Sequence, residues 1–245
     1  MGLNDVEVTW LGHATFLIET PEGDEILVDP WLEGNPKCPD EYTDVEPDAI
    51  LITHGHNDHI GDVFETADRC DGPIVGIFDL TTWLGFEGVD DEQLVGMNKG
   101  GTVDLYDEGV DVAVSMTNAH HSSSYTTEDE EVVYLGEPAG FVLEFSNGES
   151  LYIAGDTCLF GDMEWIGEIY SPSAAILPIG DHFTMDPEQA AIAADLVGVD
   201  EVIPCHFGTF GLLTGTPDEL REELTEIGDA DIDVIALKPG SSHQW

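Results

Sequence analysis

The segment from Thr53 to His59, THGHNDH, gathers three histidines and one aspartate within six positions. Imidazole nitrogens and carboxylate oxygens are the ligands that zinc and similar divalent metals take in proteins. The segment directly follows the apolar run 49–53, which reads as a buried strand. A loop leaving a strand end can turn the first two histidines to one side and the aspartate with the third histidine to the other. This geometry could serve two adjacent metals. The candidate ligands are His54, His56, Asp58 and His59.

Four further acidic or histidine residues stand at the ends of predicted strands. They are Asp29 in VDPW, His121 in AHHS, Asp156 in AGDT and His206 in PCHFGT. Together with the HxHxDH pattern at 54–59, their order resembles that of the metallo-β-lactamase superfamily. The resemblance covers almost the whole chain. It implies an α/β fold, a four-layer αββα sandwich formed by residues 1–245 as a single domain, with the site at one edge of its two sheets.

The same resemblance implies a role for each of these residues. One metal would be held by His54, His56 and His121, and a second by Asp58, His59 and His206, with Asp156 as the bridge. A hydroxide between the two metals would be the nucleophile, because metal binding lowers the pKa of water toward about 7. Asp58 would also orient this hydroxide, and Asp29 would position the histidine loop from behind the ligands. Zinc is the default metal for such a site, and manganese or iron would also fit its ligand types.

A narrower resemblance begins at residues 9–15, TWLGHAT. This stretch is similar to the branch of the superfamily that holds ascorbate-6-phosphate lactonase-like enzymes and compact, uncharacterised metal-dependent hydrolases. It implies hydrolysis of a small ester, lactone, amide or phosphoester. Other activities of the same fold remain as alternatives: an RNA-processing nuclease, a mononuclear-iron dioxygenase, or a metal-binding module without catalysis. A di-iron protein of this fold is a further alternative. The di-iron branch has a glutamate where His56 stands, which argues against this alternative.

Several histidines are ambiguous from the sequence. Adjacent side chains on an extended segment face opposite ways, so only one of His120 and His121 should reach a metal; the family pattern favours His121. His13, which follows a strand, is expected to make a structural hydrogen bond behind the metals. His182 follows another buried strand and is a candidate proton donor or oxyanion stabiliser, or else a local structural group.

The chain carries 52 Asp and Glu residues against 5 Lys and Arg residues, a formal net charge of −47. The acids are spread along the whole sequence, which is not the pattern of an acidic tail. Phosphate binding needs clustered cations, so the composition excludes nucleic acid as an expected partner. Such a chain repels itself at low ionic strength, whereas molar salt screens charges to within about 3 Å. We therefore expect a halophile protein from a salt-filled cytoplasm.

The remaining partners follow from composition. No apolar run approaches the roughly 18 residues of a membrane span, and the first residues lack a secretory pattern, so we expect a cytoplasmic protein without a membrane partner. The substrate should be a small molecule, neutral or singly charged, because Lys37 is the only cation expected to approach the site. The oligomeric state stays open.

The elements that position these residues can be outlined. Strands are expected at 6–10, 15–19, 26–28, 74–77, 103–105, 110–116, 141–145, 151–154, 174–179, 202–205 and 234–237. Helices are expected at about 60–69 and after two capping signals, Asp186–Pro187 and Thr216–Pro217, ending before Gly198 and Gly228. The polar stretch 122–131 is predicted as a mobile loop that could act as a lid. The four cysteines are expected as free thiols, and Trp31 is the best candidate for a pocket wall.

Overall fold

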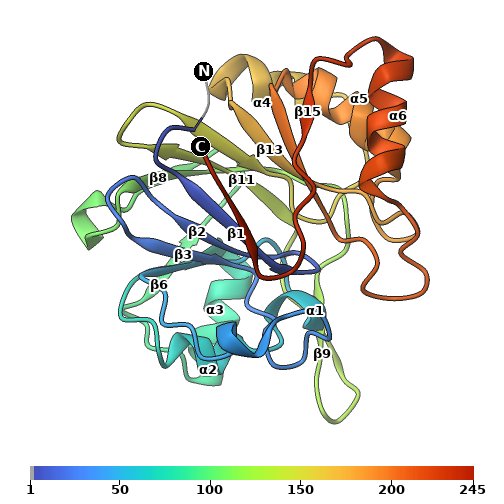
Figure 1. Cartoon of the computed structure of the whole chain (residues 1–245). Coiled ribbons are helices and arrows are strands. Elements are labelled where there is room, and N and C mark those ends of the chain that lie inside the picture. The colour runs from blue at the N-terminus through green and yellow to red at the C-terminus, as the bar shows by residue number, and fades with distance from the viewer. Residues whose placement is uncertain (1–2) are drawn as a thin grey trace.

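The computed structural model describes residues 3–245, in which two seven-stranded sheets pack face to face (Figure 1). The first sheet has the order β16-β1-β2-β3-β4-β5-β6. Its members pair antiparallel from β16 to β3 and parallel from β3 to β6. The strands are β1 (Glu7–Gly12), β2 (Thr15–Glu19), β3 (Glu25–Val28), β4 (Ala49–Leu51), β5 (Ile74–Ile77), β6 (Leu94–Met97) and β16 (Ser241–Gln244).

The second sheet repeats this plan with the order β15-β14-β13-β12-β11-β8-β7. Its antiparallel part runs from β7 to β12 and its parallel part from β12 to β15. The expected hairpin at 141–154 is present as the β11–β12 pair. The strands are β7 (Thr102–Asp104), β8 (Val112–Asn118), β11 (Ala139–Phe145), β12 (Ser150–Ile153), β13 (Ala174–Pro178), β14 (Glu201–Cys205) and β15 (Asp233–Val234).

Helices cover the outer faces, α2 and α3 on the first sheet and α4, α5 and α6 on the second (Figure 1). The layers are therefore αββα, as expected. Residues from both sheets, such as Phe16 and Phe141, meet in the largest apolar core, and a second core lies between β12, β13 and α5. The helices are α1 (Asn57–Ile60), α2 (Val63–Ala67), α3 (Phe78–Glu87), α4 (Met163–Tyr170), α5 (Pro187–Val197) and α6 (Pro217–Ile227). No helix among the described residues is long and apolar enough to cross a membrane.

The two capping signals form as expected. Asp186 accepts the backbone N–H of Gln189 at 2.8 Å. Thr216 accepts the N–H of Glu219 at 3.2 Å and donates its hydroxyl to the Glu219 carboxylate at 2.8 Å. Both helices therefore begin at the proline that follows the cap.

The expected continuous helix over 60–69 is wrong, because Gly61 and Asp62 separate two short helices, α1 and α2. A Cβ on Gly61 would lie 2.7 Å from the Trp31 ring, so the two segments meet too closely for another side chain. Asp62 accepts the N–H of Leu32 at 2.6 Å and donates its own N–H to Pro30. These two hydrogen bonds hold residues 30–32, which follow β3, against the junction between α1 and α2.

The stretch 122–131 is not simply a loop, since its middle forms β9 (Ser124–Thr126), which pairs with β10 (Val132–Tyr134). This two-stranded hairpin projects from the body of the sandwich (Figure 1). The last residue of β9 is fixed by Asn57, whose side chain bonds the backbone N–H and C=O of Thr126 at 2.9 Å. The hairpin is therefore attached to the histidine loop at the end beside its own turn.

Candidate metal centre

Three of the candidate residues directly follow strands in a left-handed backbone conformation. They are His13 after β1 (φ +56°), Asp29 after β3 (φ +51°) and His206 after β14 (φ +58°). Non-glycine residues rarely adopt this conformation, and those that do concentrate at functional sites. Because these strands run the same way in their sheets, their carboxyl ends meet at one edge of the sandwich. Residues that follow β4, β8 and β12 reach the same edge.

Asp29 ties the end of β3 to the histidine loop. It is 1% exposed, and it accepts the backbone N–H of Thr53 at 2.8 Å and the Thr53 hydroxyl at 2.7 Å. Its Oδ2 atom also lies 2.7 Å from Nδ1 of His59. Asp29 therefore contacts the histidine loop at two residues, Thr53 and His59.

These contacts orient two histidines. The Thr53 hydroxyl donates to Asp29, so it must accept Nδ1–H of His54, which lies 3.0 Å away. The unprotonated Nε2 of His54 then faces the centre of the site. His59 donates its Nδ1–H to Asp29, which likewise turns Nε2 inward. Second partners of this kind fix the ring orientation of metal-binding histidines.

The inward-facing atoms form two groups. In each group the ligand atoms lie within 4.8 Å of one another. Asp156 lies between the groups, with Oδ2 at 3.1 Å from Nε2 of His206, 3.4 Å from Nε2 of His59 and 3.5 Å from Nε2 of His121. The first group is His54, His56 and His121, and the second is His13, Asp58, His59 and His206.

Buried atoms in this cluster lack hydrogen-bond partners among the described residues. They are Nε2 of His59, Oδ1 of Asp156 and Nδ1 of His206. Leaving such atoms unsatisfied is costly, and a divalent cation between them would satisfy the first two. The donor set, neutral imidazoles and carboxylates, also suits the metals expected from the sequence. The residues present therefore fit a metal centre.

The electrostatics of the cluster favour cations. Burial lowers the pKa of His54 well below its usual range, and it also lowers those of His56 and His121, so these rings are neutral, the form in which imidazole can bind a metal. Burial opposes ionisation of Asp156, but His206 and His59 hold its pKa well below its usual range. Burial also works against the charged form of His59, yet Asp156 and Asp29 raise its pKa. A metal would take the place of that proton.

His13 makes a hydrogen bond within the cluster and also reaches the second group of potential ligand atoms. It is fully buried, with Nε2 at 3.2 Å from Oδ2 of Asp58 and Nδ1 at 3.0 Å from the Thr209 hydroxyl. Burial lowers its pKa to about 4, against the effect of its hydrogen bond with Asp58. Its Nε2 belongs to the second group of ligand atoms. His13 also accepts the backbone N–H of His206, so it joins the two sheets at the site.

The neighbours His120 and His121 face apart, as the alternation rule requires. His121 points into the cluster, whereas Nε2 of His120 lies 2.8 Å from the amide of Asn118 and its ring packs on Phe160. His182 is exposed and packs against Phe183 with ring centroids 4.4 Å apart. The structure does not bring His182 into either group of ligand atoms; Phe183 faces the cleft in its place.

A cleft of about 570 Å³ opens over the two groups. Asp58, Asp156 and His206 form its polar floor. Its apolar wall contains Trp31 and Phe210, whose ring centroids lie 6.0 Å apart, together with Phe183. Trp31 was expected there from its position after Asp29. Phe183, in the loop after β13, was not predicted there.

The position of Lys37 differs from expectation, whereas the free thiols agree with it. Lys37 packs against Gly12 and is absent from the described cleft walls, whereas Lys99 lines a neighbouring cleft together with His121. The prediction that Lys37 alone approaches the site is therefore wrong. All four cysteines are free thiols in the structure. Cys205 is buried, whereas Cys158 is exposed.

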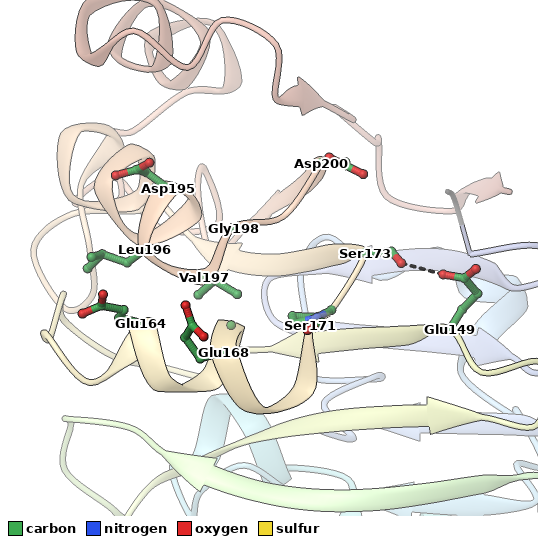
Figure 2. Close-up of a pocket in the computed structure, with 12 residues that line it drawn as sticks. Glu149, Glu164, Glu168, Ser171, Ser173, Asp195, Leu196, Val197, Gly198 and Asp200 are labelled. Carbon is green, nitrogen blue, oxygen red and sulfur yellow. Dashed lines mark hydrogen bonds between the residues drawn. The ribbon is translucent and has the colours of Figure 1, made fainter.

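A separate hollow lies between α4 and the end of α5 (Figure 2). Its polar side chains are mainly carboxylates, among them Glu164, Glu168 and Asp195. Glu149 at its rim already accepts the Ser173 hydroxyl at 2.6 Å. No histidine or cysteine is among the described residues that line it. Its acidity reflects the composition of the chain, and the chemistry belongs to the histidine cluster.

Comparison with known proteins agrees with this geometry. Residues 24–207 match the model of the beta-lactamase superfamily domain. A UPF0173 metal-dependent hydrolase of Chloroflexus aurantiacus is 49% identical over 241 residues, which is 97% of each chain. Another of Roseiflexus castenholzii is 48% identical over 242 residues, again 97% of each chain. The structure of Igni18, a metallo hydrolase from the archaeon Ignicoccus hospitalis, superposes with a TM-score of 0.82 at 35% identity, over 98% of this chain and 99% of that one.

The sandwich and its histidine edge therefore define a protein of the metallo-β-lactamase class. Within that class, the chain belongs to the UPF0173 metal-dependent hydrolase family.

Proposed function

We propose that this protein, acting as a single domain, is a binuclear metal-dependent hydrolase of a small ester, lactone, amide or phosphoester. The observation that carries the proposal is the pair of adjacent ligand groups with Asp156 between them. His54, His56 and His121 would hold one cation, and Asp58, His59 and His206 the other. Divalent cations bound there, zinc by default, would lower the pKa of water and polarise the oxygen of the scissile bond.

The protein's own groups supply position and charge. Asp58 faces the cleft with its side chain 33% exposed, and burial is outweighed by its hydrogen bond to His13, so its pKa lies well below its usual range. The carboxylate is therefore ionised and can accept a hydrogen bond from the attacking water. Nε2 of His13 lies 3.2 Å from Oδ2 of this carboxylate and holds it in place. Trp31 and Phe210 would exclude bulk water from one side of the substrate.

Three finer proposals accompany this one. The net charge of −47 supports the proposal that the protein functions in the salt-rich cytoplasm of a halophile. The likeness of residues 9–15 to ascorbate-6-phosphate lactonase-like enzymes stays a prediction and adds lactones to the substrates worth testing. His182 stays a candidate proton donor, which would need its exposed loop to turn toward the cleft when substrate binds.

The test combines elemental analysis with a substrate panel. Protein purified in high salt without chelator should contain about two zinc or manganese ions per chain and cleave members of an ester, lactone and phosphodiester panel. Asp156→Asn should lose metal and turnover together. Asp107→Asn, an exposed site in the 3-10 turn Tyr106–Glu108, is the matched control and should lose neither. One iron per chain would instead support a dioxygenase, and folded protein that takes up no metal would refute the proposal.

A further inference from the structure

We propose that the cleft beside the metal centre binds a carboxylate or similar anionic group of the substrate through Lys99. This inference rests on the proposed hydrolase function and names the class of substrate. The second cleft has a volume of about 770 Å³. His121, Ser122 and Ser124 line both this cleft and the one over the metal centre, so the two clefts are adjacent. A substrate cleaved at the centre could therefore extend past His121 to Lys99.

Lys99 is held at the wall of the cleft by the backbone. Its turn is fixed to β8, because Gly100 donates to Met116 C=O at 2.8 Å and Met116 donates to Gly101 C=O at 3.0 Å. The lysine side chain is only 21% exposed. Its ammonium donates to Oδ1 of Asn118 at 2.8 Å and faces Glu137 at 3.2 Å. The positive charge is thus positioned before any ligand arrives.

The hydrogen bonds beside Lys99 fix the orientation of the Asn118 amide. An ammonium can only donate, so Asn118 must turn its oxygen to Lys99 and its NH₂ group to Nε2 of His120, 2.8 Å away. Nε2 of His120 is therefore an acceptor, and Nδ1 carries the proton of the ring. The backbone N–H of His120 donates to the Thr157 hydroxyl at 3.0 Å. The wall of this cleft is thereby joined to the loop that carries Asp156.

The partner of Lys99 is exchangeable. Glu137 is 70% exposed, and exposed ion pairs contribute little to stability, so a ligand carboxylate can replace it at low cost. Other cations of the chain serve structure: Arg69 donates to two backbone carbonyls, and Arg221 pairs with Asp218 on its own helix. Among the described residues that line the two adjacent clefts, Lys99 is the only lysine or arginine. An anionic substituent therefore finds one cation within this surface, and it is Lys99.

The experiment compares substrates that differ only in a distal charge. The p-nitrophenyl monoesters of succinic, glutaric and adipic acid are measured against neutral p-nitrophenyl esters of the same chain length, after subtraction of the uncatalysed rates. We expect the ratio of kcat/KM, anionic over neutral, to fall roughly tenfold in Lys99→Gln and to be retained in Lys99→Arg. Glu137→Gln should raise the ratio, because it removes the competing carboxylate. Rising KCl should reduce the ratio of the wild type.

Lys238→Gln is the matched control, since it removes one positive charge from a remote turn. An equal fall of the ratio in Lys238→Gln and Lys99→Gln would show a general field effect and overturn the proposal. An unchanged ratio in Lys99→Gln, with a normal melting temperature, would overturn it as well. If the wild type cleaves no ester, calorimetry of metal-loaded protein with glutarate and with butyrate still decides. Tighter binding of glutarate that disappears in Lys99→Gln supports the subsite, whereas equal binding refutes it.

Discussion

The Oδ2 atom of Asp29 lies 2.7 Å from Nδ1 of His59, in a contact from which water is excluded. The same carboxylate accepts the Thr53 hydroxyl, which in turn accepts Nδ1–H of His54. One buried carboxylate therefore orients one histidine of each proposed metal site. It contacts His59 directly and His54 through the Thr53 hydroxyl. Both proposed metal sites depend on Asp29, so a substitution of Asp29 should change metal binding at both.

Asp29→Asn should weaken both metal sites. An amide NH₂ group facing His59 would compete with its Nδ1–H and favour the ring form that protonates Nε2, the atom aimed at the metal. We expect metal affinity to fall by about 10- to 100-fold, as for other changes to groups that hold metal ligands. Competition with a chromogenic chelator measures this loss. Asp107→Asn is the control, and unchanged affinity in Asp29→Asn would contradict the orienting role.

Replacing the two adjacent histidines should have opposite outcomes. His121→Ala removes a ligand atom of the first group, so we expect bound metal to fall from about two ions to about one and turnover to drop by at least about 100-fold. His120→Ala leaves both groups intact and should retain both ions. Elemental analysis of the two variants, purified side by side, is the measurement. Two ions bound to His121→Ala would remove this residue from the ligand set.

The residues of the proposed site are easier to recognise in the sequence than some of the elements that surround them. Asp29, His121, Asp156 and His206 could be recognised because each follows a strand and belongs to a motif of fixed order. The position of His13 depends on how β1 meets β14 across the two sheets, a long-range contact that local spacing does not show. Lys99 was overlooked for the same reason, since its turn reaches the site only through pairing with β8.

Several elements were missed because tertiary contacts decide them. The strand β16 has the polar sequence SSHQ, and it forms because Ser241–Gln244 pairs with Glu7–Trp10; His243 therefore lies in a sheet rather than in a free tail. The helix α3 contains two threonines and an internal glycine, and it has no strong apolar face from which to predict it. The helix α4 was also missed; it is short, with eight residues, and only Met163 and Ile166 are buried.

Stability should depend strongly on salt. The carboxylates of this chain repel one another over a Debye length of about 10 Å at 0.1 M salt, and over only about 3 Å at 1 M. We expect the urea midpoint to rise steadily as KCl increases over this range, and the folded circular dichroism signal to be lost on dialysis into salt-free buffer. A midpoint independent of KCl would contradict both the repulsion and the halophile origin.

Glu25→Gln should stabilise the protein at pH 7. Burial, Asp48 and Glu19 raise the pKa of Glu25, and Glu19 lies directly opposite it on β2. A raised carboxyl pKa means that the folded state prefers the proton, so the wild type loses stability as pH rises from about 4 through the raised pKa. The substitution should therefore gain about 0.2–1 kcal/mol at pH 7 and nothing at pH 3.

Urea unfolding at the two pH values, at one fixed KCl concentration, measures the Glu25 effect. Glu22→Gln in the exposed turn before β3 is the control for the loss of one negative charge. An equal gain in both variants would assign the effect to net charge alone rather than to the carboxylates around Glu25.

The pairing of β16 with β1 has a consequence for how the chain is made. On the ribosome, β1 emerges early and His13 with it, yet the strand that covers its edge is translated after all the other strands. Until then the edge from Glu7 to Trp10 is open to pairing with another nascent chain. The negative charges that destabilise the folded protein at low salt would keep such unfinished chains apart by repulsion. A pause in translation near residue 240 would prolong the exposure of this edge and so test whether that repulsion prevents pairing.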